Sequence, residues 1–463
     1  MLMDAQMSLT IDLGKFLSTV DFDDLPTEAV MLASNAFTDT VAVMMSGVTE
    51  PIVQILHQEV SANGSAKQAR ACFSDLWLSA PDAALINSTA AHAQDFDDQA
   101  LTGHPSAILV PAILAEAETL GSNGRQMATA YVAGYEVWAD LVGRGRDYHS
   151  KGWHPTSVFG TIGAAAAVAA LRRLPAERAS AALAIAASHA SGLAVNFGTM
   201  TKPYHAGMSA RNGLFSARLA ASGATASPYA LEHERGFLTA ISPDGGAVDR
   251  TTPTKVGSEF QLPSHGLCVK RYPTCYFMHR SFDSAAKMLE GKSISADDVE
   301  QVVVTMNRGQ AAVLVNEKPQ TGNQARFSGH FAMAAAVILG KMGLEELRDD
   351  VVQRPDMQEF FPKVTIVTMD DYDSRDPVHA TTERVVIRLK NGEELDTGEI
   401  RTIRGHAFDP LTTDELWQKF RECTSKTHSE DEAKLLFKRT QSLPSLGSTS
   451  ELPVVSGLFA SSA

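Results

Sequence analysis

The chain has 463 residues, 44% of them hydrophobic and 20% charged, and its formal net charge is −14. This composition is typical of a globular protein, and the length exceeds what one ordinary core holds, which predicts two domains. The negative charge argues against nucleic acid or an anionic membrane surface as a general partner. It does not argue against a small anion, which responds to the local field of a pocket.

The N-terminal segment MLMDAQMSLTIDLGKF has no basic stretch followed by an unbroken apolar run, so we expect no signal peptide. The most apolar segment, 157–171, is shorter than the roughly 20 residues that a membrane helix needs. The four cysteines form no CxxC pair, which argues against a zinc ribbon or a redox motif. These features predict a cytoplasmic protein without a membrane partner.

Residues 1–265 are expected to be almost entirely helical. A first long helix is predicted to begin near Asp24 and Pro26 and to end at Gly47, because proline suits the first turn of a helix and glycine its end. Further helical patterns follow at 82–93, 108–121, 126–143, 160–174 and 210–223. Small residues are abundant in these segments and let helices approach closely, so we predict a large, tightly packed all-α domain.

The pattern changes after about residue 265. β-Branched segments at 300–307, 363–370 and 383–400 predict strands, and Asn391-Gly392 predicts a tight hairpin turn. With a helix expected at 326–347, these strands predict a smaller α/β domain at 266–404. The fold class is therefore mainly α with a smaller α+β domain.

Helical sequence returns at 413–426, so we assign residues 405–463 to the large domain together with 1–265. The tail from about residue 440 is rich in Ser, Pro and Gly and lacks periodicity. It is expected to be mobile or docked on a neighbouring chain.

Two stretches contain no Asp or Glu, one from Arg178 to Leu231 and the other from Phe260 to Phe282. Both hold lysines, arginines and histidines. In a chain of strongly negative net charge, such stretches point to an anion-binding site. For the first stretch the alternative is that tightly packed Ala/Gly helices simply exclude carboxylates.

The segment AHAQDFDDQALTGHPS crowds Asp95, Asp97 and Asp98 between His92 and His104. On a helix that continues to residue 98, His92, Asp95 and Asp98 share one face, while Asp97 points elsewhere. A carboxylate beside a histidine fixes its tautomer and raises its basicity, as a general base requires. Two alternatives stay open: a solvated helix end, and a metal site, although no established metal-ligand spacing is present.

Two further candidates lie next to prolines. His154 stands between Trp153 and Pro155 at a helix entry, where contact with the indole would desolvate the imidazole and favour its neutral form. Such a His-Pro turn is also a common structural feature. Lys202 precedes a proline, which disfavours helix and should hold the lysine on a loop. The helix that follows would add amide donors for a carboxylate.

The chain resembles the MmgE/PrpD family from about residue 8 to 420, in the segments AHAQDFDD, GHPS, GWHPTSVFGTIGAAAA, NFGTMTKPYHAGMSARNG and KRYPTCYFMH. That family includes 2-methylcitrate dehydratases, cis-aconitate decarboxylases and iminodisuccinate epimerases. The resemblance implies a large all-α domain built from both chain ends, a smaller α/β lid domain and a homodimer. It also implies a substrate site at the domain interface, without a metal.

Site residues carry over one at a time. Asp95 matches the first aspartate of the family's DFDD motif, His104 the histidine of its HPS turn and His154 that of its GWH motif. Lys202 matches the lysine of its KP loop, and Lys270 the lysine that opens the KRYP segment. The resemblance implies that these side chains surround the substrate.

Two positions depart from the family pattern. Cys275 stands where animal cis-aconitate decarboxylases have a histidine, and Phe331 stands where many members have a tyrosine. The missing hydroxyl removes a candidate acid and hydrogen-bond donor, which argues against decarboxylation. Cys275 and Asp98 are included as candidate substrate contacts.

The family's common chemistry is proton transfer on a carbon next to a carboxylate. We therefore expect a lyase or isomerase of small di- or tricarboxylates, with dehydration or epimerisation preferred over decarboxylation. His154 and His104 would be the acid/base pair, Asp95 the orienting carboxylate, and Lys202 with Lys270 the carboxylate clamps.

The chain has no GxSxG elbow of a serine hydrolase, and it has no glycine-rich phosphate loop, so no nucleotide cofactor is implied. No cofactor is expected. The alternatives are a non-catalytic carboxylate-binding protein of the same fold and a metal-dependent hydrolase.

Overall fold

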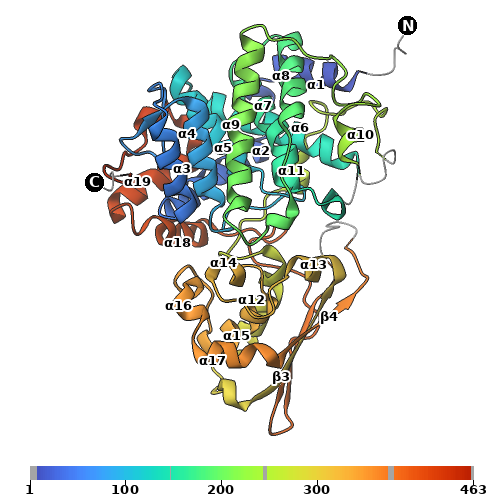
Figure 1. Ribbon diagram of the computed structural model, residues 1–463, viewed down its shortest axis with the longest axis vertical. Coiled ribbons are helices and arrows are strands. Elements are labelled where there is room, and N and C mark those ends of the chain that lie inside the picture. The colour runs from blue at the N-terminus through green and yellow to red at the C-terminus, as the bar shows by residue number, and fades with distance from the viewer. Residues whose placement is uncertain (1–7, 146–147, 243–247, 374–379, 460–463) are drawn as a thin grey trace. The chain divides into compact units, whose positions relative to one another are not determined.

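The computed structural model describes residues 8–145, 148–242, 248–373 and 380–459 (Figure 1). The chain divides into two compact units, one formed by Met1–Ala93, Asp97–Cys268 and Thr412–Ala463, the other by Gln94–Phe96 and Val269–Leu411. The first unit is almost wholly helical, and the second combines short helices with a sheet. The predicted fold class, mainly α with a smaller α+β part, is confirmed.

The first unit takes its helices from both ends of the chain. Their bounds are α1 (Leu9–Thr19), α2 (Thr27–Gly47), α3 (Pro51–Ala62), α4 (Ala80–His92), α5 (Ser106–Leu120), α6 (Gly124–Gly143), α7 (Pro155–Leu171), α8 (Ala176–His189), α9 (Thr201–Ala221), α10 (Phe237–Ile241), α11 (Gln261–His265), α18 (Thr413–Thr424) and α19 (Glu430–Gln441). A short hairpin pairs β1 (Ala69–Arg70) with β2 (Trp77–Leu78). The C-terminal helices α18 and α19 pack on α2.

Small residues let the central helices of this unit approach closely. α9 packs against α4, α7 and α8 (Figure 1). A Cβ added at Gly213 would lie 2.5 Å from the Cβ of Ala164 in α7, and one added at Gly207 would lie 2.1 Å from the hydroxyl oxygen of Thr89 in α4. Protein interiors are packed too densely to absorb such an overlap. Glycine is therefore required where α9 meets these two helices.

Among the described residues, one helix, α2, is long and apolar enough to cross a membrane by length and composition alone. Most of its apolar window, 72%, is buried inside the unit. A buried core helix has the same composition, because its surface meets other helices rather than water.

A four-stranded sheet in the order β4-β3-β5-β6 forms the framework of the second unit. β3 (Val299–Asn307) is parallel to β4 (Val364–Met369) and antiparallel to β5 (Arg384–Leu389), which pairs antiparallel with β6 (Glu394–Asp396). The predicted Asn391-Gly392 turn joins β5 to β6, and Gly392 has a φ of 87°, in the left-handed region that favours glycine.

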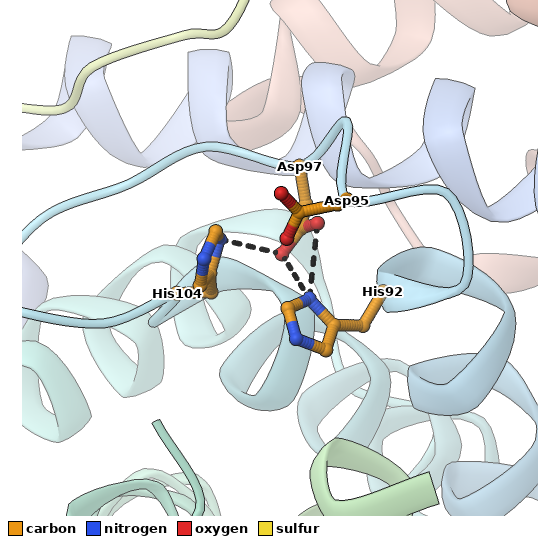
Figure 2. Close-up of side chains that lie close together, drawn as sticks. All are labelled: His92, Asp95, Asp97 and His104. Atoms are coloured by element: carbon orange, nitrogen blue, oxygen red, sulfur yellow. Dashed lines mark hydrogen bonds and ion pairs between the residues drawn. The ribbon is translucent and has the colours of Figure 1, made fainter. Parts of the chain in front are cut away.

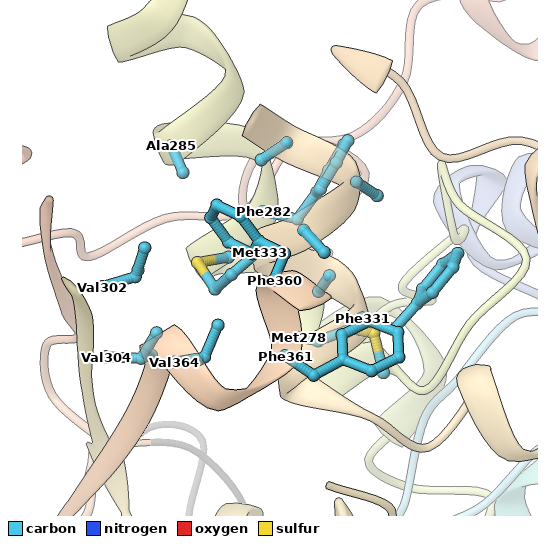
Figure 3. Packing of buried hydrophobic residues seen from close by; sticks show 14 of the residues in the cluster. Met278, Phe282, Ala285, Val302, Val304, Phe331, Met333, Phe360, Phe361 and Val364 are labelled. Atoms are coloured by element: carbon cyan, nitrogen blue, oxygen red, sulfur yellow. The ribbon is translucent and has the colours of Figure 1, made fainter. Parts of the chain in front are cut away.

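Helices cover one face of this sheet (Figure 1). They are α12 (His279–Leu289), α13 (Arg308–Val313), α14 (Gly322–Ala325), α15 (Gly329–Ala334), α16 (Asp349–Val352) and α17 (Pro355–Phe360). Figure 3 shows Phe282 of α12 and Met333 of α15 facing Val302 and Val304 of β3 and Val364 of β4. These strand residues point inward because side chains alternate between the two faces of a strand.

The helix expected at 326–347 is divided in the structure. After α15 the chain continues as a single π-helical segment over Ala335–Leu339, and Gly340 ends it with a left-handed φ of 66°. A 3-10 turn follows at Glu345–Leu347. The apolar pattern of residues 326–347 continues on both sides of Gly340. The sequence therefore did not show that the helix ends at this glycine.

The described part of the tail packs on its own chain. Residues after α19 form 3-10 turns at Leu443–Ser445 and Thr449–Glu451, and Leu443 and Leu446 are buried. A Cβ added at Gly124, the first residue of α6, would lie 1.6 Å from the carbonyl oxygen of Leu443. The described part of the tail therefore packs against its own helical unit.

Candidate functional site

α4 ends at His92 instead of continuing to Asp98 as the sequence suggested. Beyond it Asp95, Leu101 and Thr102 have φ values of 53°, 52° and 59°, a left-handed conformation that interrupts a helix. α5 begins only at Ser106. The aspartates of this segment therefore do not follow helical spacing, and their directions are set by the turn.

Asp97 lies between two histidines (Figure 2). Its Oδ2 is 2.9 Å from Nδ1 of His92 and 3.1 Å from Nδ1 of His104, and its Oδ1 is 3.1 Å from Nδ1 of His92. Nδ1 of His104 is also 2.9 Å from the main-chain oxygen of Asp98. Since all of these oxygens are acceptors, each Nδ1 carries a hydrogen. In the neutral imidazoles, Nε2 is then left as an acceptor.

Burial and hydrogen bonding together determine the charge states of Asp97 and His92. Asp97 and His92 are both buried. Burial lowers the pKa of His92 to about 4, against the opposing effect of Asp97. Burial alone would raise the pKa of Asp97, but His92 and His104 hold it well below its usual value. Asp97 is therefore an ionised carboxylate, and His92 is neutral at neutral pH.

His154 caps the start of α7 and faces His205 of α9, with their Nδ1 atoms 3.2 Å apart. One of these nitrogens donates and the other accepts, so the two tautomers are complementary. The ring that meets His154 edge-on belongs to Phe197, with centroids 4.9 Å apart, whereas the sequence had suggested Trp153. Burial, and then the charge of Lys202, lowers the pKa of His154 well below its usual value, so the neutral form is favoured.

The two pairs of imidazoles adjoin each other. The ring of His92 lies nearly parallel to that of His154, at an interplanar angle of 24° and with centroids 6.0 Å apart. Its centroid is 4.7 Å from that of His104. The site in the first unit is thus a group of histidines with one carboxylate among them.

Lys202 lies in the first turn of α9 rather than on the predicted loop. Pro203 fits there, because the first N–H groups of a helix have no intrahelical partner. The lysine is buried, and its Nζ lies 5.6 Å from the centre of the Phe197 ring. After burial, its charge is the next cause that lowers the pKa of His154 and His205. A buried ammonium near two helix starts makes this region favourable for an anion.

Asp98 has partners in the interior. Its carboxyl group accepts a hydrogen bond from Ser106, whose hydroxyl oxygen is 2.7 Å from that of Tyr131. Burial, together with the Asp39 carboxylate, raises the pKa of Asp98 well above its usual value. Asp39 in turn pairs with Lys419 of α18 at 2.6 Å. The role of Asp98 as a substrate contact stays a prediction.

Asp95, Lys270 and Cys275 belong to the second unit. Nζ of Lys270 donates to the carbonyl oxygen of Asp95 at 2.6 Å and to its Oδ2 at 2.9 Å. These bonds stabilise the left-handed backbone of Asp95. Cys275 is buried before a 3-10 turn, and Phe331 lies in the hydrophobic core of this unit. The catalytic or binding roles of Asp95, Lys270 and Cys275 stay predictions.

The metal alternative rests on His92, Asp97 and His104, whose ligand atoms lie within 4.8 Å of one another. A metal ion held between Asp97 and the two Nδ1 atoms would have to displace the hydrogens that both nitrogens carry. The charge of Lys202, which lowers the pKa of His92, would also oppose a cation. The donor set therefore fits proton transfer better than metal binding.

The sequence interpretation did not select Asp97 or His205. It set Asp97 aside because helical spacing was assumed to continue past His92. His205 is three residues after Lys202 and shares its helical face, but this spacing carried no weight while the lysine was placed on a loop.

Substituting Asp97 by Asn should destabilise the protein by about 2 kcal/mol, because the neutral amide would place an NH2 group, a donor, where Oδ1 now accepts from His92, and a buried donor is left unpaired. Asp98→Asn is the matched control. Asp98 already favours its neutral form, and Asn can still accept from Ser106, so we expect a loss under about 1 kcal/mol. Urea unfolding of both variants at neutral pH measures the difference, and equal losses would contradict the bridging role of Asp97.

Comparison with known proteins places these residues in a family. Residues 11–248 match the MmgE/PrpD N-terminal domain, and residues 272–443 match the MmgE/PrpD C-terminal domain. Human cis-aconitate decarboxylase is 29% identical over 395 residues, which cover 82% of this chain and 79% of that protein. The mouse cis-aconitate decarboxylase is 29% identical over 388 residues, covering 80% and 77%.

The cis-aconitate decarboxylase-like protein oryM of Aspergillus oryzae is 24% identical over 472 residues, which cover 96% of each chain. The family domains together span most of the sequence, from residue 11 to residue 443. The chain belongs to the MmgE/PrpD family.

Proposed function

We propose that this chain is a cofactor-independent lyase or isomerase that transfers a proton at the carbon next to a carboxylate of a small di- or tricarboxylate. The observation that carries this proposal is the group of buried and half-buried histidines beside the Lys202 ammonium in the first unit. A carbon acid of this kind needs a neutral base and a cation aimed at the carboxylate.

Lys202 supplies the charge that an anionic substrate needs. A carboxylate beside it would regain in the protein the favourable interactions that it loses on leaving water. The starts of α7 and α9 lie near this ammonium, since the side chains of His154 and His205 meet there, and the positive end of each helix dipole adds to its field. Charge that develops on the carboxylate during proton removal would be stabilised by this field.

His154 and His104 are the proposed acid/base pair. Burial keeps His154 neutral, so it can accept a proton from carbon, and His205 at its Nδ1 can exchange donor and acceptor roles with it. Asp97 lies 3.1 Å from Nδ1 of His104, and this contact fixes the orientation of the imidazole for proton transfer. Asp95, Lys270 and Cys275 of the second unit are retained as further proposed contributors.

The nature of the leaving group is a separate question. The sequence favoured dehydration or epimerisation, but the relatives described above carry the name cis-aconitate decarboxylase or are named as similar to it. This comparison favours decarboxylation, whereas Phe331 and Cys275 depart from the family pattern. We propose cis-aconitate as the first substrate to test, followed by hydroxylated tricarboxylates, in a cytoplasmic enzyme.

The shared proton step can be tested without knowing the leaving group. We expect the protein to incorporate deuterium from D2O next to a carboxylate of its substrate, and His154→Ala to slow this exchange by about 100-fold or more, as removal of a general acid–base group does. His265→Ala, at an exposed histidine of α11, is the control and should change the rate less than twofold.

NMR of di- and tricarboxylates in D2O gives the exchange rate. A loss below about tenfold in His154→Ala would overturn the assignment of His154. Tight carboxylate binding without any exchange would favour the non-catalytic alternative.

We also propose a homodimer. Leu193, Val195 and Met200 expose 51%, 84% and 46% of their surface on the segment that carries Phe197 to His154. Apolar side chains grouped in this way are typical of protein interfaces.

Light scattering should give a mass near twice the 49.6 kDa of one chain. Val195→Asp should lower the measured mass toward that of the monomer, because it places a charge on this apolar surface. Val315→Asp, at an exposed valine of the second unit, should leave the mass unchanged. A monomeric native protein would contradict this proposal.

A further inference from the structure

The second ring nitrogen of His92 is not used by any contact described above. This Nε2 is buried and has no hydrogen-bond partner among the residues that the structure describes. Figure 2 shows it on the side of the ring turned away from Asp97. Buried polar atoms in folded proteins are almost always paired, by protein, water or a ligand. The unpaired nitrogen therefore points to a group that comes from outside the chain.

The chemistry of this nitrogen is fixed by its neighbour. Because Nδ1 of His92 donates to Asp97, Nε2 of the neutral ring can only accept a hydrogen bond. The side chain of His92 is 0% exposed and that of His104 is 11% exposed. Burial lowers the pKa of His92 to about 4, so the ring stays an acceptor at neutral pH. Lys202, in contrast, offers donors alone.

We propose that His92 is a further substrate-contacting residue, whose Nε2 accepts a hydrogen bond from a hydroxyl group on a di- or tricarboxylate. This inference rests on the proposed function, since it places the hydroxyl in the site where Lys202 binds a carboxylate. A carboxylate oxygen cannot pair with Nε2, because both are acceptors. A hydroxyl can, and a ligand without one leaves the nitrogen unpaired.

The charged and titratable groups around His92 agree with this assignment. Asp97 holds Nδ1, His104 lies on one side with ring centroids 4.7 Å apart, and His154 lies parallel at 6.0 Å. The charge of Lys202 further disfavours a proton on Nε2. A neutral donor such as a hydroxyl can bind next to His92, whereas a cation there would be repelled by Lys202.

Citrate and tricarballylate test the proposal directly, because these tricarboxylates differ only in one hydroxyl group. By calorimetry, the native protein should bind citrate about tenfold more tightly than tricarballylate, the ratio expected for one buried hydrogen bond. His92→Asn keeps an amide donor near Asp97 but has no acceptor at the Nε2 position. It should bind the two ligands equally, with its affinity for tricarballylate within twofold of that of the native protein.

His92→Gln is the matched variant, since its longer side chain can place an amide oxygen near the Nε2 position. It should keep a preference for citrate of about threefold. A native protein that binds both ligands equally, or an Asn variant that keeps the tenfold ratio, would overturn the inference while the proposed function stands. If the native protein binds neither ligand, the inference fails, whereas the proposed function is decided by the deuterium exchange described above.

A second measurement observes ligand binding to the native protein itself, so its result does not depend on the affinities of the variants. The 15N resonance of His92 Nε2 should move on addition of citrate in the direction expected for a nitrogen that accepts a hydrogen bond. Tricarballylate should leave it near its position in the free protein. The same response to both ligands would contradict a hydroxyl contact.

Discussion

Asp97 is fully buried, and its two oxygens accept hydrogen bonds from Nδ1 of His92 and from Nδ1 of His104. A carboxylate in such a place must be paired, because leaving it unpaired costs several kcal/mol. Pairing by two imidazoles satisfies the charge, and it also fixes the tautomer of both rings. The basic nitrogens of both histidines are thereby turned away from the carboxylate, and the proposed chemistry depends on this arrangement.

Close helix packing makes this arrangement possible. α9 approaches α4 at Gly207 and α7 near Gly213, and each contact excludes any larger side chain. With the helices so near, His92 at the end of α4, His154 at the start of α7 and His205 in the first turns of α9 meet in one buried region. Since these groups lie in the helical unit, their tautomers and charges are set by that unit's own packing.

The sequence predicted the secondary structure correctly where the type of residue alone determines it. β-Branched runs located β3 to β6, Asn391-Gly392 located their hairpin, and small residues indicated closely packed helices. His104, His154 and Lys202 were identified as candidates, and the structure places them in one unit. Their predicted roles nevertheless came from resemblance, since spacing alone does not show which groups meet.

The predictions from sequence were wrong where the direction of the backbone determines which side chains meet. Asp97 was set aside because a helix was extended past His92, whereas left-handed residues such as Asp95 turn the chain there. Within the second unit the Asp95 carboxylate binds Lys270, 175 positions away in the chain, and no local pattern pointed to this pair. Pairings between distant segments depend on the tertiary fold, and local patterns contain no information about them.

The tautomers of His92 and His104 test the central claim most directly. Long-range 1H–15N spectra of the histidine-labelled protein at neutral pH, assigned with His92 and His104 variants, report which ring nitrogen carries the hydrogen. A carboxylate shared between the two rings predicts the Nδ1–H tautomer for both histidines. An Nε2–H tautomer at either one would mean that Asp97 does not bridge them, and the account of the site would be contradicted.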